Sequence, residues 1–463
     1  MNQLDTIAAV STPYGKGGIA VLRISGEDAE AIADKIFEPK NKKKLSQIDG
    51  CRATYGSIFE YRNGNKVQID DGIAVVFRAP QSFTGENTVE ISCHGGILVT
   101  QKVLSAILSA GARMALPGEF TKRSFINGKM SLSSAEALGD LLEAQSDEQI
   151  SLARSGMNGI LSGSVSEIYN SLCTVLAAIF AKIDYPDEDL AEISLDDMHK
   201  VASENLEKLK KLADTYSTGR AVSEGIPTVI LGRTNAGKSS LYNRIVGRDA
   251  AIVTDIEGTT RDILTESANL GRVCLRLSDT AGLRRADNLV EKIGIDKAKK
   301  IAEDAELVLA VFDGSRATDS EDEKFIKYLK TLNGVKIAII NKSDLPQIND
   351  FKAALNCFDA QISVSADTGD GFDTLVNTVE KLYIDKNLDV ARDAIIANAR
   401  QSSAINNAIA SLEGAIIAIK QQLPLEICCS ETELCLQSLG EFDGRTVSED
   451  IVAKIFSNFC VGK

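Results

Sequence analysis

One short stretch, residues 226–240, limits what this chain can fold into more than any other part of it. Its apolar first half, residues 226–231, has the length and composition of a buried strand. Gly232 to Ser239 then match the phosphate-loop pattern G-x-x-x-x-G-K-S, with helical spacing behind them. In such a loop the backbone N–H groups, the helix N-terminus and Lys238 attract phosphate, and the Ser239 hydroxyl can bind Mg²⁺. The stretch therefore predicts a triphosphate site in an α/β domain.

Four further stretches of the chain each follow an apolar run that is typical of a buried strand. Because a parallel sheet places its ligand-binding loops at the carboxyl ends of its strands, we expect these stretches to complete the same site. Asp279 can hold Mg²⁺ through water, Gly282 can donate its N–H to the γ-phosphate, and Thr260 can offer an oxygen to the metal. The Asp344 carboxylate can accept hydrogen bonds from two guanine N–H groups, which selects GTP over ATP, and the Ser365-Ala366 pair can give a backbone donor to the guanine carbonyl. The predicted contacts are Ala236, Gly237, Lys238, Ser239, Ser240, Thr260, Asp279, Thr280, Ala281, Gly282, Asn341, Lys342, Asp344, Ser365 and Ala366.

The residue after Gly282 is Leu283, where many GTPases place the glutamine that orients the attacking water. Another group must therefore position the water, and the polar candidates in the following segment are Arg284, Arg285 and Glu291. A monovalent cation near Asn235 could replace the positive charge of an arginine finger.

Length and charge narrow the class of protein. A chain of 463 residues is long enough for about three domains. Its net charge of −14 excludes a surface that attracts nucleic acid without specificity. The nine cysteines form no C-x-x-C pair and there are two histidines, so a zinc site or a disulfide framework is not expected. Neither a signal peptide nor a long apolar run is evident, which predicts a cytoplasmic protein without a membrane partner.

Periodicity divides the chain into four segments. Residues 1–127 mix short strands with glycine turns, and residues 221–385 alternate strands and helices as in a doubly wound parallel sheet. Residues 128–220 and 386–463 have helical spacing, which predicts one bundle interrupted by the nucleotide domain. Within this bundle, a single apolar stripe over residues 150–183 predicts one long helix, and residues 217–219 predict a linker.

Two charged residues of the first segment stand out. Alternation over residues 18–26 places Arg23 on the same strand face as Ile19 and Val21, and Glu90 lies in a second predicted strand, residues 87–92. A charge on such a face is costly unless an anion or a carboxylate meets it. The pattern leaves open whether the two residues are surface charges, pair with each other or meet a ligand.

Near the C-terminus, Ser448 can cap a helix with Ile451, Ile455, Phe456 and Phe459 on its apolar side. The Cys-Val-Gly-Lys sequence of residues 460–463 follows. A terminal tetrapeptide is normally frayed and a lone cysteine normally inert, so physical reasoning alone assigns no function to it.

Motifs spread along the whole chain nevertheless carry a family resemblance. They are Gly17-Gly18, Arg23 to Gly26, Phe83 to Glu86, His94 to Gly96, Pro117 to Phe120, Gly258 to Asp262 and Phe459 to Lys463. With this set, the chain resembles the tRNA-modification GTPase family MnmE, also called TrmE.

The resemblance implies a multidomain α+β and α/β fold. An N-terminal α+β domain over residues 1–127 would bind tetrahydrofolate and dimerise. Residues 128–220 and 386–463 would form a discontinuous all-α helical bundle, and residues 221–385 an inserted Ras-like P-loop GTPase domain.

The same resemblance implies an activity and partners. A potassium-dependent GTPase of this kind is a homodimer, and with the FAD-dependent MnmG it forms a heterotetramer. Together they would add an aminomethyl or carboxymethylaminomethyl group to carbon 5 of the wobble uridine of certain tRNAs. The implied cofactors are K⁺, Mg²⁺, GTP and 5-formyl- or 5,10-methylene-tetrahydrofolate.

By position, the resemblance also implies residue roles. The folate contacts would be Arg23, Glu90, Lys129 and Lys463. The potassium ligands would be Asn235, Thr254, Ile256 and Thr259, of which Asn235, Thr254 and Thr259 also contact GTP; Ser239 and Thr260 would bind Mg²⁺. Glu291 would organise the hydrolytic water, Asn235 would act with the cation, and Cys460 matches a functionally required cysteine.

Two other readings remain open. A ribosome-assembly GTPase could use the first segment as an adaptor, although such a protein needs a basic RNA-binding surface and this chain has no basic C-terminal module. A folate-dependent one-carbon transferase could use the GTPase only for regulation. Folate binding by the first segment separates the family reading from the ribosomal one, and dependence of product formation on hydrolysis separates it from the transferase.

Overall fold

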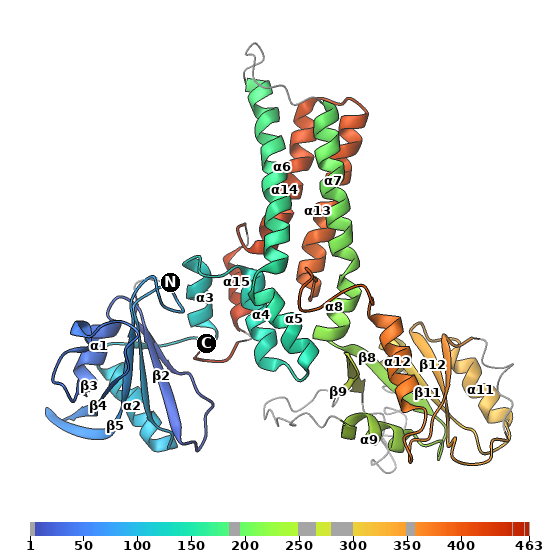
Figure 1. The fold of residues 1–463 in the computed structure, drawn as a ribbon, viewed down its shortest axis with the longest axis horizontal. Helices are drawn as coiled ribbons and strands as arrows, with labels where there is room; N and C mark the ends of the chain where they lie inside the picture. The colour runs from blue at the N-terminus through green and yellow to red at the C-terminus, as the bar shows by residue number, and fades with distance from the viewer. Residues whose placement is uncertain are drawn as a thin grey trace. The chain divides into compact units, whose positions relative to one another are not determined.

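A computed structural model describes residues 5–184, 195–248, 265–278, 300–348, 357–446, 448–457 and 459–462. The chain divides into two compact units (Figure 1). The first unit comprises residues 1–139 and 440–463, and the second comprises residues 140–439. The four predicted domain boundaries stay predictions, but residues 440–463 group with the N-terminal part of the chain.

A seven-stranded sheet in the order β3-β4-β5-β6-β2-β1-β7 forms the base of the first unit. Its neighbouring strands are antiparallel except β1 and β7, which are parallel. The strands are β1 (Ile7–Val10), β2 (Ile19–Ser25), β3 (Phe37–Pro39), β4 (Thr54–Arg62), β5 (Asn65–Phe77), β6 (Thr88–His94) and β7 (Arg113–Met114). The two strands predicted at 18–26 and 87–92 are confirmed as β2 and β6.

Side-chain alternation sets the buried face of this sheet. In β2, Leu22 and Ile24 are fully buried, while Val21 and Arg23 lie on the opposite, partly exposed face. The helices α1 (Ala29–Ile36) and α2 (Ile97–Ser109) contribute their apolar residues to the same core as Leu22 and Ile24. The face that carries Arg23 is partly covered by a small buried cluster of Ile7, Ala9 and Phe120, and Arg23 itself stays partly exposed.

A small helical cluster completes the first unit. It contains α3 (Glu119–Ile126), the start of α4 (Leu132–Glu143) and α15 (Glu449–Ser457). Leu132 packs in one buried cluster with Val452 and Phe456. The predicted helix after Ser448 is thus confirmed, but the prediction that Ile451 lies on its apolar side is wrong. Ile451 is 47% exposed and Val452 takes the buried position, because Val452 lies three and four residues before Ile455 and Phe456 and so is centred on their face, whereas Ile451 lies at its edge.

The second unit contains a long helical bundle. Its helices are α5 (Asp147–Met157), α6 (Ile160–Asp184), α7 (Leu195–Asp214), α8 (Tyr216–Ser223), α13 (Ala399–Lys420) and α14 (Leu425–Asp443). Val175 of α6 and Met198 of α7 share a buried cluster with Ala418 of α13 and Cys428 of α14 (Figure 1). Helices from before and after the nucleotide domain therefore form one bundle, as predicted.

Two helix predictions in this bundle are wrong. The stripe over residues 150–183 belongs to two helices, because Gly159 adopts a φ of +75° that ends α5 before α6 begins. Residues 217–219 lie inside α8 rather than in a linker. A Cβ on Gly219 would lie 2.0 Å from the Ile396 carbonyl oxygen, so glycine is present for close packing and not for flexibility.

By length and apolar composition, α13 is the one helix among the described residues that could cross a membrane. It is a central helix of the bundle, with Ala404, Ile405, Ala408 and Leu412 buried in the protein. The core helix of a protein without a membrane span can be equally long and apolar, so the length and composition of α13 are weak evidence for a membrane span.

The nucleotide domain of the second unit is built on a six-stranded sheet in the order β13-β12-β11-β8-β10-β9. All neighbours are parallel except β9 and β10. The strands are β8 (Ile226–Gly232), β9 (Thr265–Leu270), β10 (Val273–Ser278), β11 (Leu307–Asp313), β12 (Val335–Asn341) and β13 (Ala360–Ser363). The described helices are α9 (Lys238–Arg248), α11 (Ser320–Leu329) and α12 (Phe372–Tyr383). The predicted α/β fold is confirmed.

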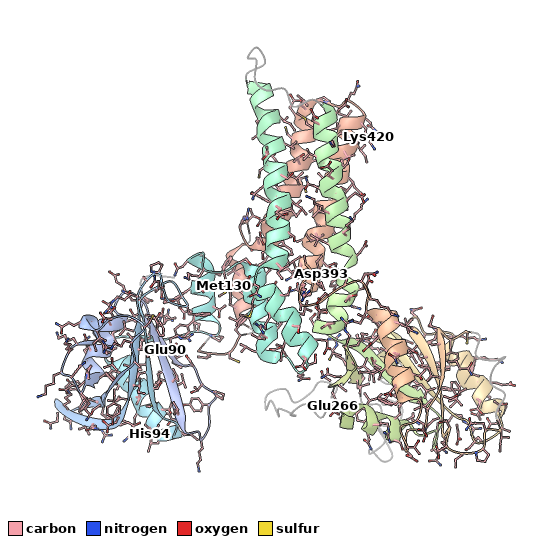
Figure 2. All side chains as sticks on the ribbon, in the orientation of Figure 1. Glu90, His94, Met130, Glu266, Asp393 and Lys420 are labelled. Atoms are coloured by element: carbon pink, nitrogen blue, oxygen red, sulfur yellow. The ribbon has the colours of Figure 1, made fainter. Side chains whose placement is uncertain are left out.

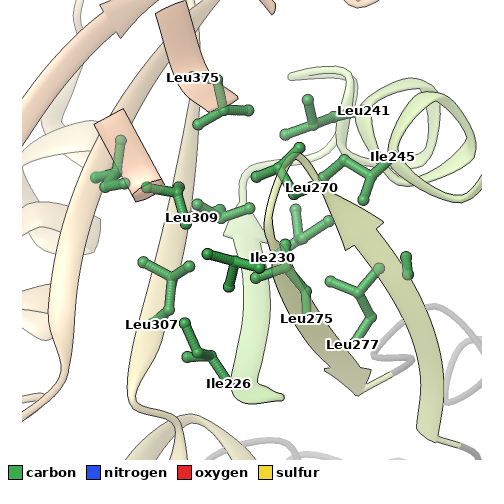
Figure 3. Packing of buried hydrophobic residues seen from close by; sticks show 14 of the residues in the cluster. Ile226, Ile230, Leu241, Ile245, Leu270, Leu275, Leu277, Leu307, Leu309 and Leu375 are labelled. Atoms are coloured by element: carbon green, nitrogen blue, oxygen red, sulfur yellow. The ribbon is translucent and has the colours of Figure 1, made fainter. Parts of the chain in front are cut away.

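Packing anchors α9 on this sheet. Leu241 and Ile245 are fully buried and share a core with Ile230, Leu275 and Leu309 of the strands (Figure 3). Because α9 begins at Lys238, this core holds the end of the phosphate loop in place.

Candidate functional site

The phosphate loop lies between β8 and α9, where the sequence predicts it. Asn235 has a left-handed φ of +63°, and both Asn235 and Ser239 are exposed. Lys238 donates from Nζ to the Arg233 carbonyl oxygen at 2.7 Å. The exposed amide and hydroxyl oxygens suit a hard cation, so the two side chains fit the predicted potassium and magnesium roles.

Asn341, at the end of β12, joins three of the predicted loops. Its Nδ2 donates to the Ala236 carbonyl oxygen at 2.9 Å, and its Oδ1 accepts from the Ala366 N–H at 2.9 Å. A Cβ on Gly237 would lie 1.9 Å from Asn341 Nδ2, so only glycine allows this approach. Asn341 is 3% exposed, and the buried amide fixes the phosphate loop and the loop after β13 to each other.

Lys342, just after β12, pairs with Asp313 at the end of β11. Lys342 has a φ of +63°, and its Nζ lies 2.7 Å from Asp313 Oδ2 at the end of β11. Burial alone would raise the pKa of Asp313, but hydrogen bonds from Lys342 and Ser315 outweigh it and hold the pKa below its usual range. Asp344 follows and is exposed, which leaves its carboxylate free to accept the predicted hydrogen bonds from guanine.

The loop after β13 is a closed turn. Ser365 is fully buried, and its N–H donates to the Asp370 carbonyl oxygen at 2.9 Å. Its Oγ accepts from the Thr368 N–H at 3.1 Å. The Ala366 N–H, predicted to meet a guanine carbonyl, donates to Asn341 in this structure.

Sequence reasoning missed an ionic cluster beside the phosphate loop. Arg233 contacts Asp319 at 2.6 Å and Asp322 at 3.2 Å, and Arg316 contacts Asp322 at 2.8 Å. The hydrogen bond from Arg233 lowers the pKa of Asp319 to about 2. Asp319 and Asp322 also form the capping box of α11, which is the only sequence signal that could have drawn attention to them.

In the first unit, Arg23 and Glu90 pair directly. Glu90 lies on β6 (Figure 2), opposite Arg23 in the antiparallel register. The Arg23 NH2 lies 2.8 Å from Glu90 Oε1, and the two side chains are 19% and 27% exposed. The guanidinium carbon is 5.3 Å from the ring centre of Phe83 and 5.5 Å from that of Phe120. This combination of charge and aromatic rings suits a flat, polar, anionic ligand.

Behind this pair, sequence reasoning missed a buried ionic network. Arg123 is 8% exposed and contacts Glu86 at 3.1 Å and Glu119 at 3.1 Å. Ser25 donates to Glu86 at 2.7 Å, and Arg113 contacts Glu119 at 2.7 Å. Burial alone would raise the pKa of Glu119, but hydrogen bonds from Arg113, the Leu116 N–H and Arg123 outweigh it, so the pKa is lowered.

The segment from Phe459 to Gly462 is held on the first unit. The Gly118 N–H donates to the Cys460 carbonyl oxygen at 3.3 Å, and the Ser11 hydroxyl donates to the Gly462 carbonyl oxygen at 3.1 Å. The expectation that this segment is frayed is wrong for these residues, because the Gly118 N–H at the start of α3 and the Ser11 hydroxyl just after β1 hold it. Cys460 itself is exposed, and Lys129 is exposed and donates to the Pro80 carbonyl oxygen at 2.9 Å.

Two families match consecutive parts of the chain. The family described as the GTP-binding protein TrmE N-terminus matches residues 6–129, and the MnmE helical domain matches residues 132–460. The curated tRNA modification GTPase MnmE of Acetivibrio thermocellus is 38% identical over 468 residues, covering 100% of each chain. The MnmE of Clostridioides difficile is 37% identical over 461 residues, and that of Lachnoclostridium phytofermentans is 39% identical over 461 residues, each covering 99% of both chains. The chain belongs to the MnmE family.

One solved structure similar to this MnmE family member is the G domain of the T. maritima FeoB iron transporter. It covers 33% of this chain and 96% of that chain at 22% identity, with a TM-score of 0.26. So low a score carries no argument, and the assignment rests on the full-length relatives and the two family matches.

Part of the predicted MnmE site lies outside the described residues. This applies to the loop before β9, to the segment after β10 and to the last residue of the chain. The predicted residues concerned are Thr254, Ile256, Thr259, Thr260, Asp279, Thr280, Ala281, Gly282, Glu291 and Lys463. Their roles stay predictions.

Proposed function

We propose that this chain hydrolyses GTP to drive the modification of carbon 5 of the wobble uridine in certain tRNAs. The added group is aminomethyl or carboxymethylaminomethyl, and a tetrahydrofolate derivative supplies its one-carbon unit. Membership of the MnmE family supports the GTPase activity and the role in tRNA modification. The finer parts of the proposal rest on the family resemblance and on the residues of this chain that match its motifs.

The observation that carries the nucleotide part is the Asn341 junction. Three loops, of which the first lies 105 residues before the second and the third 25 residues after it, meet at one buried amide, at the carboxyl ends of parallel strands. This is the position in which α/β sheets bind ligands. Lys238 and the start of α9 face the phosphates, and Asp344 selects guanine by accepting its two N–H protons.

For hydrolysis, the proposal names the residues that hold the two cations and the residue that organises the attacking water. Ser239 and Thr260 hold Mg²⁺, while Asn235, Thr254, Ile256 and Thr259 hold K⁺. A potassium ion supplies positive charge where charge develops in the transition state, as an arginine finger does in other GTPases. Glu291 organises the attacking water, because Leu283 offers no polar group.

The folate part of the proposal uses the face of the first sheet that carries Arg23. Arg23 and Glu90, with the partly exposed Phe83 beside them, provide a charged and aromatic surface for 5-formyl- or 5,10-methylene-tetrahydrofolate, and the fully buried Phe120 packs against the guanidinium. Lys129 and Lys463 complete the contacts. Cys460 acts in the modification, supported by its exposure on a segment that backbone hydrogen bonds hold in place.

The proposal includes partners and a compartment. The chain acts as a cytoplasmic homodimer and forms a heterotetramer with the FAD-dependent MnmG. The complex with MnmG binds the tRNA, because a net charge of −14 gives the chain itself no general attraction for nucleic acid.

Nucleoside mass spectrometry of total tRNA tests the proposal. A strain lacking this protein is complemented with wild type, with Cys460→Ser or with Cys51→Ser, an exposed cysteine elsewhere in the first unit. Aminomethyl-type uridines are expected to vanish on deletion and to return with wild type and Cys51→Ser but not with Cys460→Ser. Unchanged nucleosides on deletion would contradict the proposal and favour a ribosome-assembly GTPase.

A further inference from the structure

An arginine of α9 that no motif predicts reaches the loop after β13. Arg244 donates from Nε to the Ala366 carbonyl oxygen at 2.5 Å, and its terminal NH2 donates to the Asp367 carbonyl oxygen. Leu241 and Ile245, on either side of it in α9, are buried in the core (Figure 3), so packing sets the position of the arginine.

The loop closes around this guanidinium. The Gly369 N–H donates to the Ser365 carbonyl oxygen at 2.8 Å, which turns the backbone back towards α9. Gly369 has a φ of +94°, and a Cβ there would lie 2.5 Å from Arg244 NH1. Glycine therefore leaves the room in which the arginine sits.

Two bonds from one planar group fix orientation as well as distance. A guanidinium presents its donors in a rigid fork, so consecutive carbonyls that accept from it cannot rotate independently. A peptide unit is planar, so holding the Ala366 carbonyl also holds the Asp367 N–H, which belongs to the same plane. The Ala366 N–H is already engaged by Asn341 Oδ1.

We propose that Arg244 is a positioning residue for guanine recognition, which orients the peptide between Ala366 and Asp367 so that its N–H meets the 6-carbonyl of the base. This rests on the proposed function, in which the loop reads guanine. Arg244 does not touch the base itself. It connects the helix that begins at the phosphate loop to the loop that reads the base.

Titration calorimetry on the full chain with three diphosphates tests this. GDP and inosine diphosphate carry the 6-carbonyl, whereas the diphosphate of 2-aminopurine riboside lacks it. Arg244→Ala is expected to weaken binding of the first two by about tenfold and to leave the third unchanged. Arg276→Ala, which removes an exposed arginine of β10, is expected to leave all three affinities unchanged.

The outcomes separate this inference from the proposed function. If Arg244→Ala binds GDP as tightly as wild type, the inference is wrong but the proposed function stands. The same holds if Arg244→Ala loses affinity equally for all three diphosphates, because the arginine would then act on the fold or on the phosphate site. A wild-type chain that binds no GDP overturns both. Should Arg244→Ala fail to fold, Arg244→Lys keeps a positive charge but has no planar fork of donors. It is expected to give a smaller loss that again depends on the 6-carbonyl, and an affinity for GDP equal to that of wild type would overturn the inference.

Discussion

Arg23 and Glu90 lie directly opposite each other on neighbouring antiparallel strands, with Arg23 Nε donating to Glu90 Oε1 at 2.9 Å. The sequence left open whether these residues pair. In the structure they do, and both remain partly accessible on the face that the helices α1 and α2 do not cover.

This pair predicts a loss of folate binding without a loss of fold. Arg23→Ala is expected to weaken binding of 5-formyltetrahydrofolate at least about tenfold, because a hydrogen bond to a charged group contributes about 1.5 kcal/mol or more. The partly exposed pair itself stabilises the fold by no more than about 1 kcal/mol. Arg62→Ala, which breaks an exposed pair with Glu60 in the same unit, is the control. Unchanged folate affinity in Arg23→Ala would remove the pair from the ligand site.

Glu119 predicts a pH dependence of stability in the first unit. Its pKa is lowered in the folded state, so its contribution is present above the unfolded pKa of about 4.3 and is lost as the pH falls through the folded value. Glu119→Gln is expected to lower the free energy of unfolding by about 2 kcal/mol at pH 7, and by less in the acid range. Urea denaturation with hydrogen-exchange mass spectrometry of first-unit peptides measures this.

The control for Glu119 is Glu38→Gln, which breaks an exposed pair with Lys66 in the same unit. Its effect on the free energy of unfolding is expected to be much smaller than that of Glu119→Gln, because solvent screens an exposed pair. A difference between Glu119→Gln and wild type that grows on acidification would contradict the assigned direction of the pKa shift.

Asn341 predicts a large effect on nucleotide affinity. Asn341→Ala leaves the Ala236 carbonyl and the Ala366 N–H without their buried partner and frees two loops to move. We expect GDP binding to weaken by about thirtyfold, equivalent to about 2 kcal/mol. Asn243→Ala, which removes an exposed amide from α9, is expected to bind GDP normally. Equal affinities of the two variants would show that the junction does not organise the site.

Two helical glycines predict opposite effects of the same change. A methyl group on Gly219 would collide with the Ile396 carbonyl oxygen at 2.0 Å, whereas Gly163 in α6 has no heavy atom within 4 Å of its added Cβ. Gly219→Ala is expected to destabilise the chain by about 2 kcal/mol, and Gly163→Ala to stabilise it by about 0.5 kcal/mol. Thermal unfolding followed by circular dichroism compares them. A neutral Gly219→Ala would mean that α8 shifts freely against residue 396.

Leu283 and Asn235 predict a dependence on potassium. GTP hydrolysis in KCl is expected to exceed that in an equal concentration of NaCl by about tenfold or more, because one well-placed positive charge stabilises the transition state substantially. Asn235→Ala is expected to remove the difference between the salts, and Asn243→Ala to preserve it. Equal wild-type rates in the two salts would exclude a specific potassium site.

Much of the nucleotide domain could be predicted because its signals are local. A strand, a glycine loop and a helix start adjoin one another at residues 226–240, and the later loops also follow their own apolar strands. The helices of the bundle were harder to predict from the sequence, because periodicity shows which face of a helix is buried but not where the helix ends. One left-handed glycine at 159 divides the long stripe, and the close approach of Ile396 explains Gly219 within α8.

The sequence by itself predicted the class of nucleotide, the order of the candidate nucleotide loops and the membership of a family, since each motif consists of residues near one another in the chain. Only the tertiary structure decided which charges meet. Arg233 pairs with Asp319 across 86 residues, Arg123 with Glu86 across 37, and Arg244 reaches Ala366 across 122. Such partners leave no spacing pattern, because the folding of the intervening chain brings them together.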